Sequence, residues 1–277
     1  LCQPAEVRGF VPVPPALGLW GIDSGIRHAV SGADYGSVRV GAFMGYRIVA
    51  GLAGLPVAPQ GPGRVSVDDP RWGGYLANIG PAEWEREYRD CVPETIGGAE
   101  FLDRYGGFTD TVTRIDRART YAVRQPTAHP IYEHHRVRLF GALLEHLAAD
   151  DRRLATKQDE SQVASRLSSV VEESYELLGE LMYQSHNSYS ACGLGSDGTD
   201  RLVRLVHARG PAAGLYGAKI TGGGSGGTVA VVARAGSAAA IQAVALQYEQ
   251  ETGRGATVIG GSSPGAAAFG VVWLQHE

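Results

Sequence analysis

The sequence has few cysteines, no long apolar run and no excess of positive charge. Its three cysteines, Cys2, Cys91 and Cys192, are odd in number and far apart, which argues against a disulfide framework and indicates a reducing cytosol. No apolar stretch approaches the roughly 18 residues that a membrane-spanning helix needs. With a net charge of −4 there is no global basic field to attract nucleic acid or an anionic membrane. We therefore expect a cytoplasmic protein with neither kind of partner.

The apolar pattern predicts helices ahead of an antiparallel β region, and so an α+β fold rather than alternating βαβ units. The 277 residues, 44% of them hydrophobic, are enough for one large domain or two ordinary ones. The stretch 101–121 is irregular and charged, and no helix or strand is predicted in it. The elements expected are strands over 17–22, 215–220, 228–233 and 268–274, and helices over 33–55, from 130, around 171–182, from 199 and over 238–249.

A glycine-rich run, Lys219-Ile220-Thr221-Gly222-Gly223-Gly224-Ser225-Gly226-Gly227-Thr228-Val229, lies between two of these predicted strands. Glycine reaches backbone conformations that a Cβ forbids, and it leaves N–H groups open to an incoming anion. Such a loop can hold a phosphate, or it can be a tight hairpin without a ligand. The run itself does not decide between these two functions.

Glycines 222, 224 and 227 also satisfy the pattern G-x-G-x-x-G of dinucleotide-binding folds. That motif needs a strand before the glycines and a helix directly after them. Here the following residues, 228–233, are β-branched and apolar, which predicts a strand instead. The dinucleotide interpretation therefore fails on its structural context.

Several further segments, taken with the glycine run, resemble the GHMP small-molecule kinases, and among them the galactokinase and L-arabinokinase branch. The glycine run is similar to the third, C-terminal motif of that superfamily. The resemblance extends over nearly the whole chain and is more specific than any single glycine loop. The other segments that carry it are Trp20-Gly21-Ile22-Asp23-Ser24-Gly25-Ile26-Arg27-His28, Gly32-Ala33-Asp34-Tyr35-Gly36-Ser37-Val38-Arg39, Gly74-Tyr75-Leu76-Ala77-Asn78-Ile79 and Ser185-His186-Asn187-Ser188-Tyr189-Ser190-Ala191-Cys192-Gly193-Leu194-Gly195-Ser196-Asp197-Gly198-Thr199-Asp200.

The resemblance implies the end of an N-terminal kinase domain of the ribosomal S5 domain 2-like type, with strands and a helix, over residues 1–60. An irregular connection would follow over 61–129, and a ferredoxin-like α+β C-terminal domain over 130–277. It also implies a sugar 1-kinase that uses ATP and Mg²⁺ to phosphorylate an anomeric hydroxyl. Glycines 222, 223, 224, 226 and 227 and Ser225 would then lie near the nucleotide phosphates.

Substrate-binding roles come from the same resemblance. Tyr35 matches a tyrosine that contacts the sugar in galactokinases, and it combines an apolar ring with a hydroxyl. Asp34 and Arg27 belong to the same expected substrate side, and an Arg fork suits phosphate. Without the resemblance, Tyr35 equally fits a half-buried interface tyrosine, and Arg27 a surface ion pair.

Two features of these kinases are missing from the 277 residues: the motif Pro-x-x-x-Gly-Leu-x-Ser-Ser-Ser-Ala and the catalytic Asp near a Met-Asp-Gln segment. The chain starts Leu1-Cys2-Gln3-Pro4, without an initiator methionine. We therefore expect the C-terminal part of a sugar kinase that is inactive alone, with its catalytic base upstream of Leu1. A separately encoded N-terminal half is a further option.

The sequence raises two other interpretations. The first is a non-catalytic module that binds a sugar or an effector and derives from such a kinase. The second is a metal site at His129, Glu133, His134 and His135, which match neither H-E-x-x-H nor H-x-x-E-H. Because adjacent histidines on a helix diverge, we expect no metal site in this chain.

Overall fold

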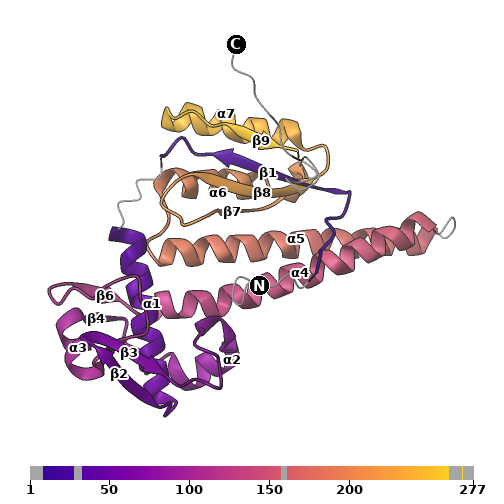
Figure 1. Ribbon diagram of the computed structural model, residues 1–277. Helices are drawn as coiled ribbons and strands as arrows, with labels where there is room; N and C mark the ends of the chain where they lie inside the picture. The colour runs from indigo at the N-terminus through magenta and orange to yellow at the C-terminus, as the bar shows by residue number, and fades with distance from the viewer. Residues whose placement is uncertain (1–8, 28–32, 157–160, 262–269, 271–277) are drawn as a thin grey trace.

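The computed structural model describes residues 9–27, 33–156, 161–261 and 270, with the backbone alone for 33–34, 150–156 and 161–168. It is a mixed α+β structure, which confirms the fold class expected from the sequence (Figure 1). The helices are α1 (Ala33–Leu52), α2 (Pro81–Glu83), α3 (Gly98–Tyr105), α4 (Arg124–Thr156), α5 (Ser161–Ala191), α6 (Asp197–Arg209) and α7 (Ala238–Thr252), with short turns η1 (Leu76–Asn78), η2 (Trp84–Tyr88) and η3 (Pro211–Ala213). The strands are β1 (Leu17–Asp23), β2 (Val57–Gly61), β3 (Gly63–Val67), β4 (Thr95–Gly97), β5 (Gly107–Phe108), β6 (Thr120–Ala122), β7 (Leu215–Ile220), β8 (Thr228–Arg234) and β9 (Val258–Gly260).

The largest sheet has the strand order β7-β8-β1-β9, so a strand from the start of the chain lies between two from its end. β1 pairs antiparallel with β8 from Leu17↔Arg234 to Asp23↔Thr228. Alternate side chains of β8 point to opposite faces of the sheet, as the two-residue period of a strand requires, and pack into different hydrophobic cores. Val229 and Val231 pack with α6 and α7, whereas Val232 packs with α4 and α5. Both faces of the sheet are therefore covered.

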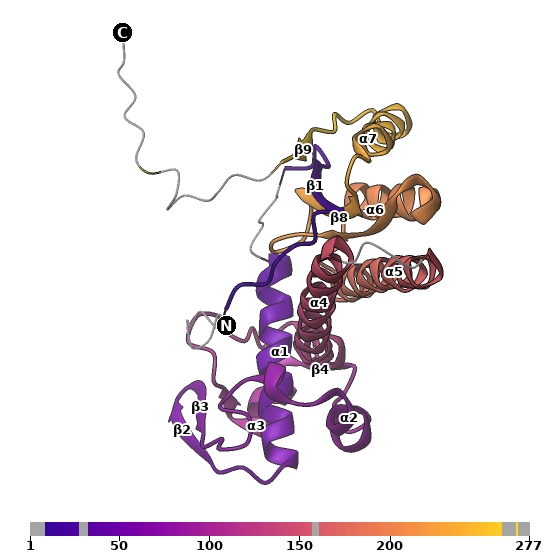
Figure 2. The same cartoon turned by 90° about the vertical axis from the view of Figure 1, so that its right-hand side faces the viewer.

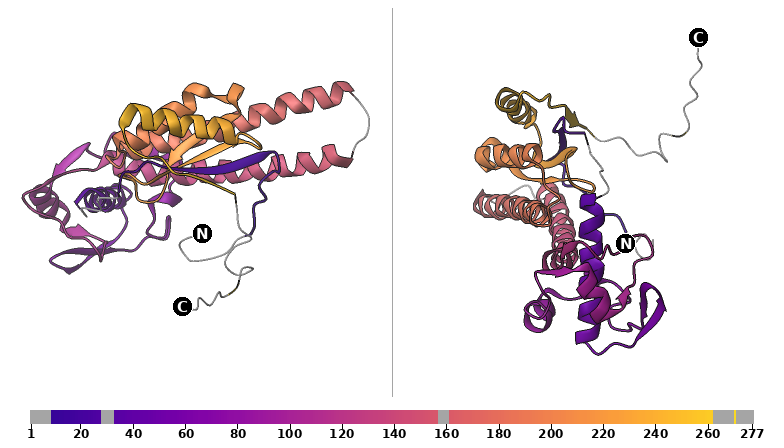
Figure 3. Two further views of the ribbon diagram at one scale, coloured as in Figure 1. Left: turned by 90° about the horizontal axis from the view of Figure 1, so that it is seen from above. Right: turned by 90° about the vertical axis from the view of Figure 1, so that its left-hand side faces the viewer.

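The helices α4 and α5 form a long antiparallel pair that extends past the sheet (Figure 1 and the left view of Figure 3). α5 approaches β7 so closely that the two backbones touch. A Cβ built on Gly179 would lie 1.9 Å from the carbonyl oxygen of Tyr216, which no real side chain tolerates. Small residues at this crossing let the helix lie directly on the strand.

The hairpin region, which we define as residues 57–123, packs on α1 at the end of the molecule away from the large sheet (Figure 2). Its core joins α1, the start of α4 and large aromatic side chains. Trp84 and Phe101 are completely buried in it. The sheet region, defined as β1 with residues 161–260, lies at the other end, and α1 links the two.

Sequence and structure differ in two places. The described part of 61–129 is not an irregular connection, because short helices and strands of 2–8 residues build the hairpin region; elements this short leave no periodic pattern. β9 was missed for the same reason. The strand expected over 268–274 lies outside the described residues. The boundaries near 60 and 130 stay predictions, although segment 1–60 supplies β1 to one region and α1 to the other.

Candidate functional site

The glycine run connects β7 to β8 as the loop of an antiparallel hairpin. The last strand pair before the loop is Ile220↔Val229, and Thr221 donates its N–H to the carbonyl of Thr228 at 3.1 Å. This confirms the strand expected after the glycines. The next helix begins only at Ala238, so the backbone lacks the strand–loop–helix arrangement of a dinucleotide fold.

The path of the loop depends on the absence of side chains at two positions. Gly224 has φ +84°, and a Cβ there would lie 2.4 Å from the carbonyl oxygen of Leu194. Gly226 has φ +124°, and its Cβ would meet the carbonyl oxygen of Ile26 at 2.9 Å. Both the left-handed conformation and the close approach therefore require glycine. Ser225 adopts φ +60° as well, which is unusual for a residue with a side chain.

Two neighbouring segments fix the loop from either side. The N–H of Ser225 donates to the carbonyl of Leu194 at 2.6 Å, and the N–H of Gly227 donates to the carbonyl of Ile26 at 3.1 Å. The hydroxyl of Ser24 donates to the carbonyl of Gly227 at 2.7 Å. The loop is thus held by the residues that follow α5 and by those that follow β1.

Four glycine N–H groups in the loop have no acceptor among the residues that the structure describes. The N–H groups of Gly222, Gly223, Gly224 and Gly226 donate to no atom of the described residues, whereas those of their neighbours Thr221, Ser225 and Gly227 do. Successive open N–H groups in a loop of mixed handedness make an anion-binding concavity. The phosphates of a nucleotide fit such a donor set.

Tyr35 stands against this loop. It is the third residue of α1 and is 51% exposed, and its ring carbon Cδ2 lies 3.8 Å from the position that a Cβ of Gly223 would occupy. The structure therefore brings together two elements that the sequence separates by nearly 190 positions. A ligand on the open N–H groups would lie beside the tyrosine ring.

The other residues of the expected substrate side lie in the same neighbourhood. Arg27 is exposed and follows Ile26, whose carbonyl holds the loop, and it makes no hydrogen bond or ion pair with a described residue. Asp34 is in the first turn of α1, but its side chain lies outside what is described. Asp23 accepts the N–H of Gly25 at 2.7 Å, which is a local turn contact. The functional roles of Arg27, Asp34 and Tyr35 stay predictions.

Tyr189 was not predicted as a site residue, yet it supports the loop directly. Its hydroxyl donates to the carbonyl of Gly222 at 3.2 Å, and the ammonium group of Lys219 lies 5.3 Å from the ring centre. The ring of His129 stands edge-on to it at 4.9 Å. Burial raises the pKa of Tyr189, so the phenol stays neutral and keeps its proton for this bond.

A half-buried carboxylate, that of Glu133 in α4, has several polar partners near Tyr189. It accepts hydrogen bonds from Ser185 at 2.6 Å and Arg136 at 2.8 Å, and Lys219 lies 3.5 Å away. Burial on its own would raise the pKa of Glu133, but the hydrogen bond from Ser185 and the two positive charges outweigh it and lower the pKa. These residues line a cavity of about 220 Å³ between α4 and α5.

His186 ties α5 to both β7 and α6. Its Nδ1 accepts the backbone N–H of Ile220 at 3.3 Å, so the ring proton is on Nε2, which faces a carboxylate oxygen of Asp200 at 3.1 Å. Burial lowers the pKa of His186 against the opposing effect of Asp200, which keeps the imidazole neutral. This contact fixes the strand that leads into the glycine loop.

Periodicity along α5 could have indicated this network. Ser188 and Tyr189 lie three and four positions after Ser185 on α5, and Cys192 follows the helix three positions after Tyr189. Cys192 is buried, and burial raises the pKa of its thiol to about 11, so this cysteine packs rather than reacts.

A metal site finds no support in the described part of the chain, which contains no group of three His, Cys, Asp or Glu side chains placed to hold an ion. His129 instead shares a hydrogen bond of 2.7 Å with Ser188. We therefore assign no residue of this chain to Mg²⁺. None of the described helices combines the length and apolar character needed to cross a bilayer.

A known protein family matches the part of the chain that contains the β7–β8 hairpin. Residues 167–250, which contain α6, β7, the glycine loop, β8 and most of α7, match the family model described as "GHMP kinases C terminal". This part of the chain is therefore a GHMP kinase C-terminal domain. The fold and the glycine loop thus define the class as the GHMP small-molecule kinases.

Two known proteins are similar to the chain over 90% or more of its length. The chain is 42% identical over 304 residues to L-arabinokinase from Arabidopsis thaliana, in an alignment that covers all of this chain and 27% of that protein. Galactokinase from Lactococcus lactis, solved with galactose, shares the fold with a TM-score of 0.53 at 15% identity, over 90% of this chain and 46% of the other. The chain is thus similar to the galactokinase and L-arabinokinase branch of the GHMP kinases, and it spans about a quarter of the length of the curated relative.

Proposed function

We propose that this chain supplies the sugar-facing and phosphate-facing part of an ATP-dependent sugar 1-kinase of the L-arabinokinase or galactokinase type. Such an enzyme transfers the γ-phosphoryl group of ATP to the anomeric hydroxyl of a sugar. One observation carries the proposal: four open N–H groups of the glycine loop lie beside Tyr35, at the place where the backbone also brings Arg27. The L-arabinokinase relative favours a pentose, L-arabinose, as the sugar.

Phosphoryl transfer relies mainly on positioning and on neutralising charge at the transferred group. In the proposed site the glycine N–H groups donate to phosphate oxygens, and their fixed geometry needs no reorganisation when the anion arrives. Tyr35 lies along the sugar and orients it by an apolar contact and a hydroxyl. Mg²⁺, when bound with ATP, would neutralise negative charge on the phosphates.

The catalytic base is assigned to no residue of this chain. Glu133 is saturated by Ser185, Arg136 and Lys219, and Asp200 faces His186 and Ser190. No contact among the described residues brings either carboxylate to Tyr35. We therefore propose that the base and the second phosphate loop are supplied from outside these 277 residues, in a cytoplasmic enzyme.

A phosphorylation assay tests the proposal in two steps. The purified chain, given MgATP and L-arabinose or D-galactose, should form no sugar phosphate. The same chain mixed with the part of the Arabidopsis L-arabinokinase that it does not match should form L-arabinose 1-phosphate, and Tyr35→Ala should reduce that rate by about 100-fold because positioning is lost. Product from the chain alone would contradict the assignment of the base.

The second candidate is a non-catalytic sugar-binding module, favoured by the exposed ring of Tyr35 beside a preformed loop. Calorimetry separates the two candidates. A module should bind L-arabinose equally well with and without MgATP, and it should remain silent in the mixing assay. A kinase part should bind the sugar more tightly when MgATP is present and regain activity on mixing.

A further inference from the structure

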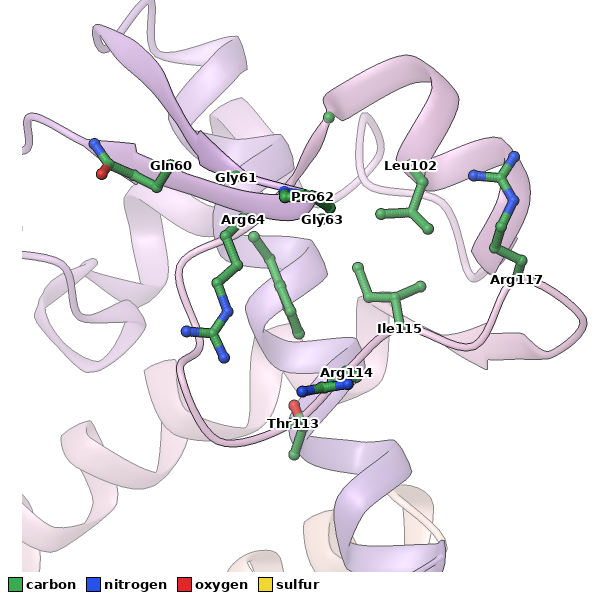
Figure 4. Close-up of a pocket in the computed structure, with 12 residues that line it drawn as sticks. Gln60, Gly61, Pro62, Gly63, Arg64, Leu102, Thr113, Arg114, Ile115 and Arg117 are labelled. Atoms are coloured by element: carbon green, nitrogen blue, oxygen red, sulfur yellow. The ribbon is translucent and has the colours of Figure 1, made fainter.

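A second concave site lies in the hairpin region, away from the glycine loop. It has a volume of about 710 Å³ and opens between the turn that joins β2 to β3, helix α3, and the segment 109–117 (Figure 4). Pockets for small molecules typically measure about 300–1,000 Å³. The size therefore suits a metabolite. We call this cavity the hairpin pocket.

One part of its wall is apolar. Leu102 of α3 and Ile115 are half-buried, and behind them Phe108 is only 1% exposed. Phe108 is itself held edge-on by Phe43 of α1, with ring centres 6.1 Å apart and an interplanar angle of 84°. This wall offers a ligand a firm apolar surface of the kind on which a ring packs.

The rest of the wall is cationic. Three arginines line the pocket, Arg64, Arg114 and Arg117, and no aspartate or glutamate does. Arg64 donates one N–H to the carbonyl of Thr111 at 2.9 Å, which orients the guanidinium and leaves its other donors. Arg117 is paired at 2.8 Å with Asp103. Arg114 has neither a hydrogen bond nor an ion pair with any described residue.

Two of these arginines share one side of the pocket. Figure 4 shows Arg64 and Arg114 both on the side of Thr113, whereas the guanidinium of Arg117 lies at the opposite end beyond Leu102. Two guanidinium forks suit the oxygens of a phosphate group. No carboxylate lines the pocket, and the neighbouring Asp110, which accepts from Thr113, is paired with Arg39 and not with these two arginines.

We propose that the hairpin pocket binds a small phosphorylated metabolite whose ring packs on the apolar wall and whose phosphate pairs with Arg64 and Arg114. A nucleoside monophosphate has this combination of groups. The pocket is remote from the β7–β8 loop, since β2, β3 and α3 lie at the other end of α1 (Figure 1). The proposal therefore does not depend on the function proposed for the glycine loop.

Binding of AMP to the complete chain tests this site, with NMR amide shifts as the readout of position. AMP should shift the amides of Gly61, Gly63 and Gly106 at the pocket more than those of the glycine loop. Adenosine and inorganic phosphate, each with half of the recognised groups, should each bind at least about 10-fold more weakly than AMP.

Arg114→Ala is the cleanest variant because this side chain makes no hydrogen bond or ion pair with a described residue. It should weaken AMP binding by about 10-fold or more without changing the melting temperature, and Arg114→Lys should recover part of the loss. Arg86→Ala is the matched control, since it removes the same charge from an exposed side chain that is paired with Glu87 outside the pocket. The control should bind AMP as the parent chain does.

Three results would overturn the proposal. One is AMP binding that Arg114→Ala and Arg86→Ala weaken equally, which would show a general charge effect. Another is equal affinity for AMP and adenosine, which would show that no phosphate is recognised. The third is an AMP response confined to residues 222–227, or none at all, which would show that the pocket takes no such ligand.

Discussion

The sheet region and the hairpin region are stabilised in different ways, although α1 runs from one to the other (Figure 1). In the sheet region backbones approach one another directly, at Gly179 on β7 and at the glycine loop on Leu194 and Ile26. In the hairpin region large side chains fill the space between short elements. Arginines lie over aromatic rings there, for instance Arg71 over Trp72 at 4.6 Å. Close backbone contact fixes the position of the glycine loop, whereas side-chain packing between short elements leaves room for the hairpin pocket.

The difference matters for the two candidate sites. The glycine loop presents backbone N–H groups, whose positions follow from the fold and survive most side-chain changes. The hairpin pocket presents arginine side chains, so its ligand preference can be altered by one substitution. The following predictions test whether this contrast holds, beginning with the largest expected effect.

Gly179→Ala should destabilise the sheet region strongly, because the new Cβ would overlap the carbonyl of Tyr216. We expect a loss of about 3 kcal/mol in the free energy of unfolding, typical of overpacking at a rigid contact. Urea denaturation measures it. Gly141→Ala in α4 is the matched control, since nothing lies within 4 Å of its Cβ, and it should stabilise by about 0.5–1 kcal/mol. Equal effects of the two changes would refute the close contact.

Asp110→Asn should be the corresponding weak point of the hairpin region. Asp110 is 1% exposed, accepts two hydrogen bonds from Arg39 at 2.7 and 2.9 Å, and also binds Thr113. Although burial opposes it, these bonds lower the pKa of the carboxyl well below its usual range. Loss of the charge should cost about 2 kcal/mol.

Glu87→Gln is the control for that change, because its pair with Arg86 is exposed. It should change the free energy of unfolding by less than about 0.5 kcal/mol. If the two substitutions had similar effects, the Arg39–Asp110 pair would not be the link between α1 and the hairpin region.

Acid should weaken the sheet region through His186. The folded chain keeps this imidazole neutral, with a lowered pKa, whereas the unfolded chain takes up a proton below a pKa of about 6.5. Stability is therefore lost as the pH falls below that value, by up to about 1.4 kcal/mol per pH unit for this one group. Urea denaturation between pH 7.5 and 5.5 should show a shallower dependence for His186→Gln. The exposed His135→Gln should keep the parent slope, and an unchanged slope in both variants would contradict the assignment.

Tyr189→Phe should have the smallest effect, about 1 kcal/mol, since it removes one hydrogen bond to the carbonyl of Gly222. Amide hydrogen exchange in residues 222–227 should become faster, while the rest of β7 and β8 stays protected. Tyr75→Phe, at an exposed tyrosine whose hydroxyl makes no hydrogen bond with a described residue, is the control. Unchanged exchange in the loop would show that Tyr189 does not support it.

The sequence predicted the sheet region well and the hairpin region poorly. Residues 215–233 carry two largely apolar runs, the second rich in β-branched residues, around the glycine loop, and such a pattern permits little besides a strand, a loop and a strand. The elements of 57–123 are too short for periodicity, and their core depends on aromatic residues far apart in the sequence. No local pattern indicates that Phe43 of α1 will meet Phe108.

The candidate site shows the same limit. The glycine loop could be predicted because its conformation demands its residues. Its neighbours Tyr35 and Tyr189 could be placed beside it only by tertiary packing, and Tyr35 was singled out by family resemblance alone. The open state of four N–H groups also depends on which carbonyls Leu194 and Ile26 bring to the loop, and the sequence does not encode those distances locally.

The central claim is that the open glycine N–H groups and Tyr35 form one phosphate-facing and sugar-facing site. An NMR titration of the chain with MgADP tests it most directly. The account predicts saturable shifts of the amides of Gly222, Gly223, Gly224 and Gly226, together with the Tyr35 ring signals, and little response at the internally bonded Thr221. If residues 222–227 and Tyr35 remain unchanged at saturating MgADP, the loop is a structural hairpin and the claim is wrong.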